Sequence, residues 1–350
     1  MEYLIPDNYY RDDLDNREVM VSIHCIAYNQ GKYIKETLDG FIAQKTNFRF
    51  EAIVHDDAST DNTADIIREY AQKYPSIIKP IFETENQYSK GDGSLSKIMY
   101  SHIRGKYVAY CEGDDYWIDP LKLQKQVDFL EKNPACSAVG SNYNKYDQET
   151  KELHPNDELG SIQTITFNDL LLHNSLATLT MVIRANILGS YQTFIKNASV
   201  WSFGDYPLWL YATTKGDIIK FPERTAVYRI LKKSASHMTN DKDRLRWAHS
   251  EFSMFDFFES QFKIPQLIKR EALFNRCHSY SRIAVAMKDD DLINRIKRAY
   301  REGRFFIALL SFKFMLKSPK FHPIYNLIES HISIKAPMLY LRNKWDKDKF

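Results

Sequence analysis

Three carboxylates within four positions follow a short apolar segment, and their types suit the binding of a metal ion. Residues 107–111 read YVAYC, and Glu112, Asp114 and Asp115 come directly after them. The apolar run predicts a buried strand, so the carboxylates would lie at the mouth of a sheet. Ligands of open α/β sheets bind beyond the carboxyl ends of the strands. Clustered carboxylate oxygens are the ligands that Mg²⁺ or Mn²⁺ uses to hold a diphosphate.

A structural interpretation of the same segment is an acidic turn that leads into a helix. Asp119 would be the N-cap of that helix and Pro120 its first residue. This interpretation accounts for Asp119. It leaves the three earlier carboxylates unexplained, because adjacent carboxylates repel one another.

Two further predicted strands also end in polar residues. Residues 50–55 (FEAIVH) lead into DDASTD at 56–61, and residues 19–27 lead into AYNQG at 27–31. Each is followed by a segment with apolar side chains at helical spacing. The polar residues of the second turn are also capable helix caps, so this turn alone does not establish a site.

These segments, taken together, resemble glycosyltransferase family 2, the inverting GT-A enzymes that use nucleotide sugars. The resemblance rests on AYN at 27–29, DDASTD at 56–61, EGDD at 112–115, and GDYPLWL at 204–210 followed by YR at 228–229. It covers residues 19–237, about two thirds of the chain. Each motif is short, and their order and spacing carry the resemblance.

The resemblance implies where the nucleotide of the donor binds. Ala27, Tyr28 and Asn29 match the segment against which the base lies, and Tyr28 matches the aromatic residue that stacks on it, usually on uracil. Asp57 matches the carboxylate that accepts a hydrogen bond from the base. A tyrosine of the core is the alternative for Tyr28.

The resemblance also implies a metal site. Asp114 matches the metal-binding member of the family's Asp-x-Asp signature, and Glu112 stands where an aspartate that contacts the ribose is usual. Asp115 completes the set of donor-binding residues. His237 lies in a region where family members place a histidine near the metal, although the usual position is occupied here by Leu231. A plain loop histidine is the alternative.

Asp205 matches the general base of the family. An inverting displacement needs a carboxylate that takes the proton of the acceptor hydroxyl on the side of the sugar opposite the leaving diphosphate. The family commonly has an acidic residue before this one, whereas Gly204 stands there in this chain. The structural alternative is that Asp205 caps a helix with Pro207 in its first turn, which does not exclude a catalytic role.

The elements that must position these residues alternate between strands and helices over the first half of the chain. This alternation predicts a Rossmann-like, mostly parallel sheet covered by helices. We place strands at 19–27, 50–55, 77–82, 107–111, 136–143, 178–184 and 217–221. Residues 241–350 have no strand-like alternation and predict a helical module. We therefore expect a GT-A catalytic domain at 1–240 and a C-terminal α-helical module at 241–350.

Charge is distributed unevenly along the 350 residues. Residues 241–350 hold 22 Lys and Arg against 13 Asp and Glu, a net charge of +9, which leaves 26 against 32, a net charge of −6, for residues 1–240. The stretch 299–317 (AYREGRFFIALLSFKFMLK) places phenylalanines between basic residues, which is typical of a helix in a membrane interface. Packing within a helical module is the alternative.

Other features favour a reducing, cytoplasmic location, with peripheral attachment to the inner face of a membrane as an open alternative. We expect no secretory signal in the acidic first residues and no apolar stretch long enough to span a bilayer. The four cysteines are few and lack paired metal spacing. No nucleic-acid partner is expected.

The sequence thus predicts a metal-dependent hexosyltransferase of surface polysaccharide biosynthesis. Its donor would be a UDP-sugar, its cofactor Mn²⁺ or Mg²⁺, and its acceptor a glycan, including one carried on a polyprenyl diphosphate. Two alternatives remain. A sugar nucleotidyltransferase would normally open with a glycine-rich, basic phosphate loop, where this chain has AYNQGKY. A non-catalytic binding module would not need the intact set of Asp57, Asp114 and Asp205.

Overall fold

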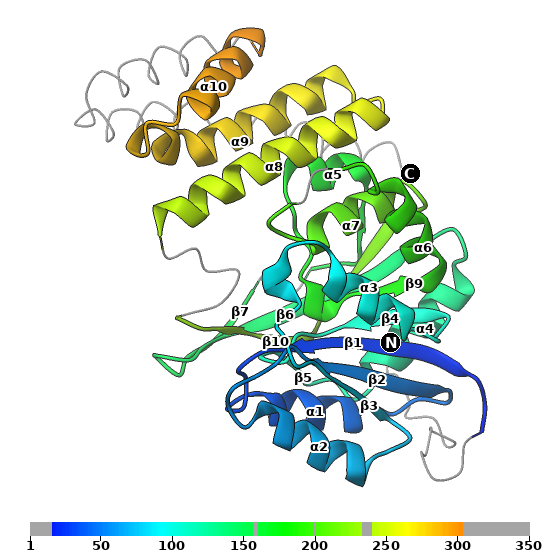
Figure 1. The fold of residues 1–350 in the computed structure, drawn as a ribbon. Coiled ribbons are helices and arrows are strands. Elements are labelled where there is room, and N and C mark those ends of the chain that lie inside the picture. Colours follow the sequence, from blue (N-terminus) through cyan, green and yellow to red (C-terminus); the bar gives the residue numbers. More distant parts are fainter. Residues whose placement is uncertain (1–15, 157–159, 199–200, 233–239, 304–350) are drawn as a thin grey trace. The chain divides into compact units, whose positions relative to one another are not determined.

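The computed structural model describes residues 16–156, 160–198, 201–232 and 240–303 (Figure 1). The chain divides into two compact units, Met1–His237 and Met238–Phe350. The first unit is an α/β domain built on one mixed sheet, and the second unit is helical over its described residues.

The sheet of the first unit has the strand order β3-β2-β1-β4-β9-β6-β10-β5. Its longest pairings, β1 with β2 and β6 with β10, are parallel, whereas β9 runs antiparallel to both of its neighbours. The two short strands β7 and β8 pair with β6 and β10. The strands are β1 Val19–Ala27, β2 Arg49–Asp56, β3 Ile78–Phe82, β4 Tyr107–Tyr110, β5 Tyr116–Trp117, β6 Ala138–Asp147, β7 Leu153–Pro155, β8 Gln163–Ile165, β9 Val182–Arg184 and β10 Ile218–Ile230.

Helices cover both faces of the sheet. Helices α1 and α2 lie on one side of β1–β3, and α3 lies on the other (Figure 1). The main core forms where apolar side chains of α1, α2 and α4 pack against alternate residues of the strands. The helices contribute Leu38, Ile67 and Leu123, among others. The helices of this unit are α1 Ile34–Ile42, α2 Thr63–Lys73, α3 Ser94–Ser101, α4 Lys122–Lys132, α5 Phe167–Leu172, α6 Ala185–Phe194 and α7 Asp205–Thr213, with 3₁₀ turns η1 Tyr88–Lys90 and η2 Thr178–Thr180.

The structure corrects several predicted boundaries. The strand predicted at 178–184 begins with the 3₁₀ turn η2, and only Val182–Arg184 pairs in the sheet. The strand predicted at 217–221 continues to Ile230, because β10 stays paired with β6 across two register shifts. Asp119 is not an N-cap, since α4 begins at Lys122 with Leu121 as its cap. Asp119 instead accepts a hydrogen bond from the backbone N–H of Leu121 and pairs with Lys125.

A buried lysine lies in the core of the first unit. Lys122 has no exposed surface, its Nζ donates to Gln126 Oε1 at 2.8 Å, and it lies 4.3 Å from the centroid of the Trp117 ring. Burial lowers the pKa of Lys122 from 10.5 to about 7, because the low-dielectric surroundings disfavour the ammonium form. Protonation of Lys122 therefore shifts the folding equilibrium towards the unfolded chain.

Lys122→Met is expected to stabilise the protein most at low pH. Between the folded pKa and the ordinary value, the unfolded chain binds more protons than the native one, so wild-type stability rises with pH. The variant lacks this dependence. At pH 6 its free energy of unfolding should exceed that of the wild type by on the order of 2–4 kcal/mol. This figure includes a loss of about 1 kcal/mol, because Gln126 loses its hydrogen-bond partner. The difference should fade towards pH 10. Urea unfolding at three pH values measures this difference, and a pH-independent difference would contradict it.

The second unit has its own apolar core. Helices α8 Asp241–Gln261, α9 Gln266–Ala286 and α10 Asp290–Glu302 contribute buried side chains that include Phe252, Cys277 and Tyr300. Asn240 and Asp289 cap α8 and α10 through side-chain hydrogen bonds. Most of the basic, phenylalanine-rich stretch at 299–317 lies outside the described residues. Within the described part of the chain, none of the helices combines the length and the apolar character needed to cross a membrane.

Candidate functional site

The polar turns predicted to form the site meet at one edge of the sheet. In the parallel registers, Ala27 of β1 lies beside Asp56 of β2, and His24 lies beside Tyr110 of β4. Two backbone hydrogen bonds extend these pairings beyond the strands, from Asp57 N to Ala27 O and from Gly113 N to Ile26 O, each 2.9 Å long. The carboxyl ends of β1, β2 and β4 therefore present their turns side by side.

The acidic turn, residues 112–115, is held closely against helix α1 and the loop before it. Thr37 Oγ1 lies 2.9 Å from the carbonyl oxygen of Gly113 and 2.6 Å from that of Asp115. A Cβ at position 113 would stand 2.9 Å from the Cβ of the buried Ala27, so this close approach favours glycine. The backbone of the turn is thus fixed by contacts that do not use the carboxylates of Glu112 and Asp114.

The carboxylates of the acidic turn are crowded in a poorly solvated place. Burial raises the pKa of Glu112 to about 8, and the negative charges of Asp114 and Asp205 add to this shift. Burial also raises the pKa of Asp114, and it raises that of Asp115 well above its usual range. A divalent cation held between Glu112 and Asp114 would offset both the cost of burying their charges and the repulsion that Glu112 feels from Asp114. The hard oxygen donors of Glu112 and Asp114 therefore fit Mg²⁺ or Mn²⁺.

Asp115 differs from the other two carboxylates. Only 3 % of its surface is exposed, and its Oδ1 accepts a hydrogen bond of 2.8 Å from the backbone N–H of Arg229. This carboxylate faces the end of β10. The predicted contact of Asp115 with the donor stays a prediction, and its visible contact is structural.

Asp57 binds backbone rather than facing open space. Its Oδ1 accepts from Gln87 N at 2.7 Å and its Oδ2 from Tyr88 N at 3.0 Å, and the side chain is 1 % exposed. Asn86 Nδ2 donates to its carbonyl oxygen. Asp57 therefore fixes the loop after β3, and its predicted contact with the base stays a prediction.

The predicted base-stacking residue is accessible. Tyr28 is 47 % exposed, so its side chain is accessible to a ligand. Asn29 has a left-handed backbone with φ of 54°, its N–H donates to Ser59 Oγ, and its Oδ1 accepts from Thr60 N at 2.8 Å. Asn29 thus joins the turns after β1 and β2, and Ala27 is buried between them.

Asp205 reaches the acidic turn from a distant part of the chain. It is the first residue of α7, with Gly204 as the N-cap, and Thr178 Oγ1 donates to its Oδ2 at 2.8 Å. The residue after Thr178 is also tied to the segment that follows the acidic turn, because Trp117 Nε1 donates to the carbonyl oxygen of Leu179 at 2.8 Å. The charge of Asp205 adds to the raised pKa of Glu112. Helix α7 is held in place because Trp209 is fully buried and Tyr206 donates to the carbonyl oxygen of Leu170.

Comparison with known proteins identifies the family of this chain. The sequence profile described as Glycosyl transferase family 2 matches residues 22–196, half of the chain. The chain belongs to glycosyltransferase family 2. This confirms the resemblance that the motifs indicated, and the matched region includes the turns at 27–29, 56–61 and 112–115.

Two bacterial proteins are examples of what this family 2 chain is similar to. An uncharacterized protein of Mycobacterium tuberculosis is 38% identical over 209 residues, which are 60% of this chain and 58% of that protein. The chain thus matches less than two thirds of that relative's length. The second is WfaP of Escherichia coli, a UDP-Glc:alpha-D-GlcNAc-diphosphoundecaprenol beta-1,3-glucosyltransferase. It is 30% identical over 199 residues, 56% of this chain and 71% of WfaP.

A solved structure confirms the GT-A fold for this family 2 chain. The mannosyltransferase PcManGT of Pyrobaculum calidifontis, solved in complex with GDP-Man and Mn2+, has a TM-score of 0.52 and 17% sequence identity. The similarity covers 89% of this chain and 87% of PcManGT. The expected α/β class with C-terminal helices is therefore correct.

Some residues of the candidate site had no clear signal in the sequence. Thr178 does not belong to any recognisable motif. Arg229 is part of the YR pair at 228–229, but the sequence around it does not indicate which residues it contacts. Both act across long separations, which only the tertiary structure reveals. His237, the second predicted metal ligand, lies outside the described residues.

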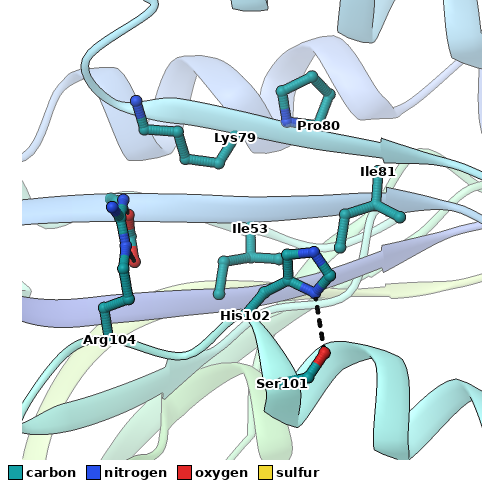
Figure 2. A pocket seen from close by; sticks show the side chains of 8 residues that line it. Ile53, Lys79, Pro80, Ile81, Ser101, His102 and Arg104 are labelled. Carbon is teal, nitrogen blue, oxygen red and sulfur yellow. Dashed lines mark hydrogen bonds and ion pairs between the residues drawn. The ribbon is translucent and has the colours of Figure 1, made fainter.

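A cavity of about 330 Å³ lies apart from these turns (Figure 2). Its floor includes Ile53 and Ile81, and Lys79, His102 and Arg104 stand around it. Arg104 is paired with the buried carboxylate of Glu51. None of the predicted site residues lines this cavity, so it does not explain the carboxylates at the sheet edge.

Proposed function

We propose that this chain is an inverting, metal-dependent glycosyltransferase that transfers a hexose from a UDP-sugar to a hydroxyl group of a glycan or lipid-linked acceptor. The observation that carries the proposal is that Thr178 binds Asp205 while the neighbouring Leu179 binds Trp117, two residues after the acidic turn, although 90 positions separate Asp205 from Asp115 in the chain. A base and a diphosphate site must face the same sugar in an inverting reaction. Family membership and the named activity of WfaP support the choice of donor.

In the proposed reaction, Asp205 takes the proton of the acceptor hydroxyl as its oxygen attacks the anomeric carbon. The bond from that carbon to the diphosphate breaks, and UDP leaves with inversion. Thr178 holds Asp205 Oδ2 and leaves Oδ1 to face the hydroxyl. Asp114 and Glu112 would hold a divalent cation, which supplies charge stabilisation for the leaving diphosphate. Tyr28 would stack on the base.

An activity assay tests this proposal. Purified protein is incubated with UDP-glucose, UDP-N-acetylglucosamine or GDP-mannose and with a GlcNAc-diphospholipid acceptor, with Mn²⁺ or with EDTA. We expect transfer from one UDP-sugar, its loss in EDTA, and a β-linked product by NMR. Transfer that persists in EDTA would contradict the proposed metal dependence. An α-linked product would contradict the proposed inverting mechanism. Pyrophosphate release from UTP and a sugar phosphate would instead identify a nucleotidyltransferase.

The proposed role of residues 241–350 is to bring the catalytic domain to an acceptor at an anionic membrane surface. The net charge of +9 in this segment and the phenylalanines at 299–317 support it. Each well-placed Lys or Arg contributes on the order of 1 kcal/mol near such a surface. Surface polysaccharide biosynthesis on a polyprenyl-diphosphate carrier would place the acceptor there.

The full-length protein should therefore co-sediment with vesicles that contain phosphatidylglycerol and not with neutral vesicles. Salt should weaken the binding, because at physiological ionic strength the attraction between exposed charges more than about 8 Å apart is largely screened. The double variant Lys313→Glu and Lys317→Glu should bind less, and Lys151→Glu with Lys196→Glu in the first unit is the matched control. Equal binding to neutral and anionic vesicles would contradict the proposal.

A further inference from the structure

Arg229 is a buried cation that connects four segments around the acidic turn. We infer that Arg229 is a positioning residue, which holds residues 112–115 in the geometry that binds the donor diphosphate. This inference rests on the proposed function, since it assigns a support to the same site. Its basis is the set of contacts that Arg229 makes at the end of β10, where only 4 % of the residue is exposed.

Each polar group of Arg229 is directed to a different partner. Its backbone N–H donates to Asp115 Oδ1 at 2.8 Å, and its Nε donates to the carbonyl oxygen of Asp114, also at 2.8 Å. Its Nη1 donates to Gln148 Oε1 at 2.9 Å, and its Nη2 pairs with Glu36 of α1. The acidic turn is thus attached to both α1 and the end of β6 through one side chain.

Three aromatic rings enclose the guanidinium. Its central carbon lies 4.9 Å from the ring centroid of Tyr33, 5.1 Å from that of Tyr116 and 5.5 Å from that of Tyr146. Such rings attract a planar cation and limit the water around it. A lysine cannot reproduce these contacts, because its ammonium lacks the planar fork of donors.

The contacts indicate support rather than chemistry. Arg229 binds the backbone carbonyl of Asp114 and leaves the carboxylate of Asp114 for a ligand. It therefore fixes the backbone from which that carboxylate projects, and Gln30 makes a side-chain hydrogen bond to the carboxylate itself. Groups that orient metal ligands in this way typically change metal affinity by about 10–100-fold when they are removed.

Arg184 provides a matched control within the same domain. Its guanidinium donates to the carbonyl oxygens of Cys136, Leu130 and Asn133, and it lies 5.6 Å from the Tyr107 ring centroid. It is thus a similarly bonded arginine beside an aromatic ring, with no hydrogen bond to the acidic turn. Loss of either arginine should destabilise the fold, and only loss of Arg229 should disturb the site.

The test compares Arg229→Lys, Arg184→Lys and Glu36→Gln with the wild type. Hydrogen exchange reports the order of residues 111–116 without any ligand, and calorimetry gives the affinity for UDP with Mn²⁺. In Arg229→Lys we expect faster exchange in this segment and UDP–Mn²⁺ affinity lower by about 10–100-fold. Arg184→Lys should leave both unchanged while lowering the unfolding temperature. Glu36→Gln, at the exposed end of the contact, should show a smaller change of the same kind with the fold intact.

The inference would be overturned if residues 111–116 exchanged hydrogen at the wild-type rate in both Arg229→Lys and Glu36→Gln. It would also be overturned if both variants bound UDP–Mn²⁺ with the affinity of the wild type. If Arg229→Lys does not fold, Glu36→Gln alone decides between these results. If the wild type binds no nucleotide while exchange still differs between the two arginine variants, the support of the turn stands and the proposed function falls.

Discussion

Asp205→Asn is expected to lower kcat by about 10²-fold or more while the affinity for UDP stays close to that of the wild type. The amide has nearly the shape of the carboxylate and still accepts from Thr178 Oγ1, but it cannot take the proton of the acceptor. Steady-state transfer kinetics and calorimetry with UDP measure the two effects separately.

Asp169→Asn is the control for Asp205→Asn. Asp169 also lies in the first turn of a helix, where its carboxylate accepts from the backbone N–H and the hydroxyl of Thr166. Its replacement should reduce stability by about 1 kcal/mol and leave kcat unchanged. Thr178→Val should lower kcat less than Asp205→Asn, because it disorients the base without removing it. A loss of UDP affinity in Asp205→Asn as large as the loss of kcat would identify Asp205 as a structural residue instead.

Asp114→Ala is expected to abolish transfer and to eliminate the effect of Mn²⁺ on UDP binding, with the fold preserved. The carboxylate of Asp114 would hold the metal in the proposed site, and the backbone of the turn is held by other groups, including Thr37 and Arg229. Circular dichroism, calorimetry with and without Mn²⁺, and transfer assays measure the three effects.

Asp115→Asn separates metal binding from support of the turn. Asp115 is buried against the backbone of Arg229, so its change should lower the unfolding temperature and affect the metal only secondarily. Near-normal transfer by Asp114→Ala would move the metal site away from Asp114.

The sequence by itself determined the family, the α/β class and the turns that form the candidate site. These follow from local patterns, because a buried strand needs a short apolar run and a change to polar residues marks its end. The strands at 19–27 and 107–110 and the turns beside them were predictable for this reason. Their parallel pairing then brings the turns together at one edge, as the registers of β1 with β2 and β4 confirm.

Only the tertiary structure decided how the site is supported. Asp57 turns to the backbone of the loop after β3, Asp205 meets Thr178, and Arg229 joins the acidic turn to α1. These contacts depend on β10 remaining paired with β6 as far as Ile230, and on α7 being buried. Such pairings join residues up to 193 positions apart, as between Arg229 and Glu36. Local periodicity cannot specify them, because the partner of a buried polar group is set by which elements pack together, and that packing minimises the exposed apolar surface of the whole domain.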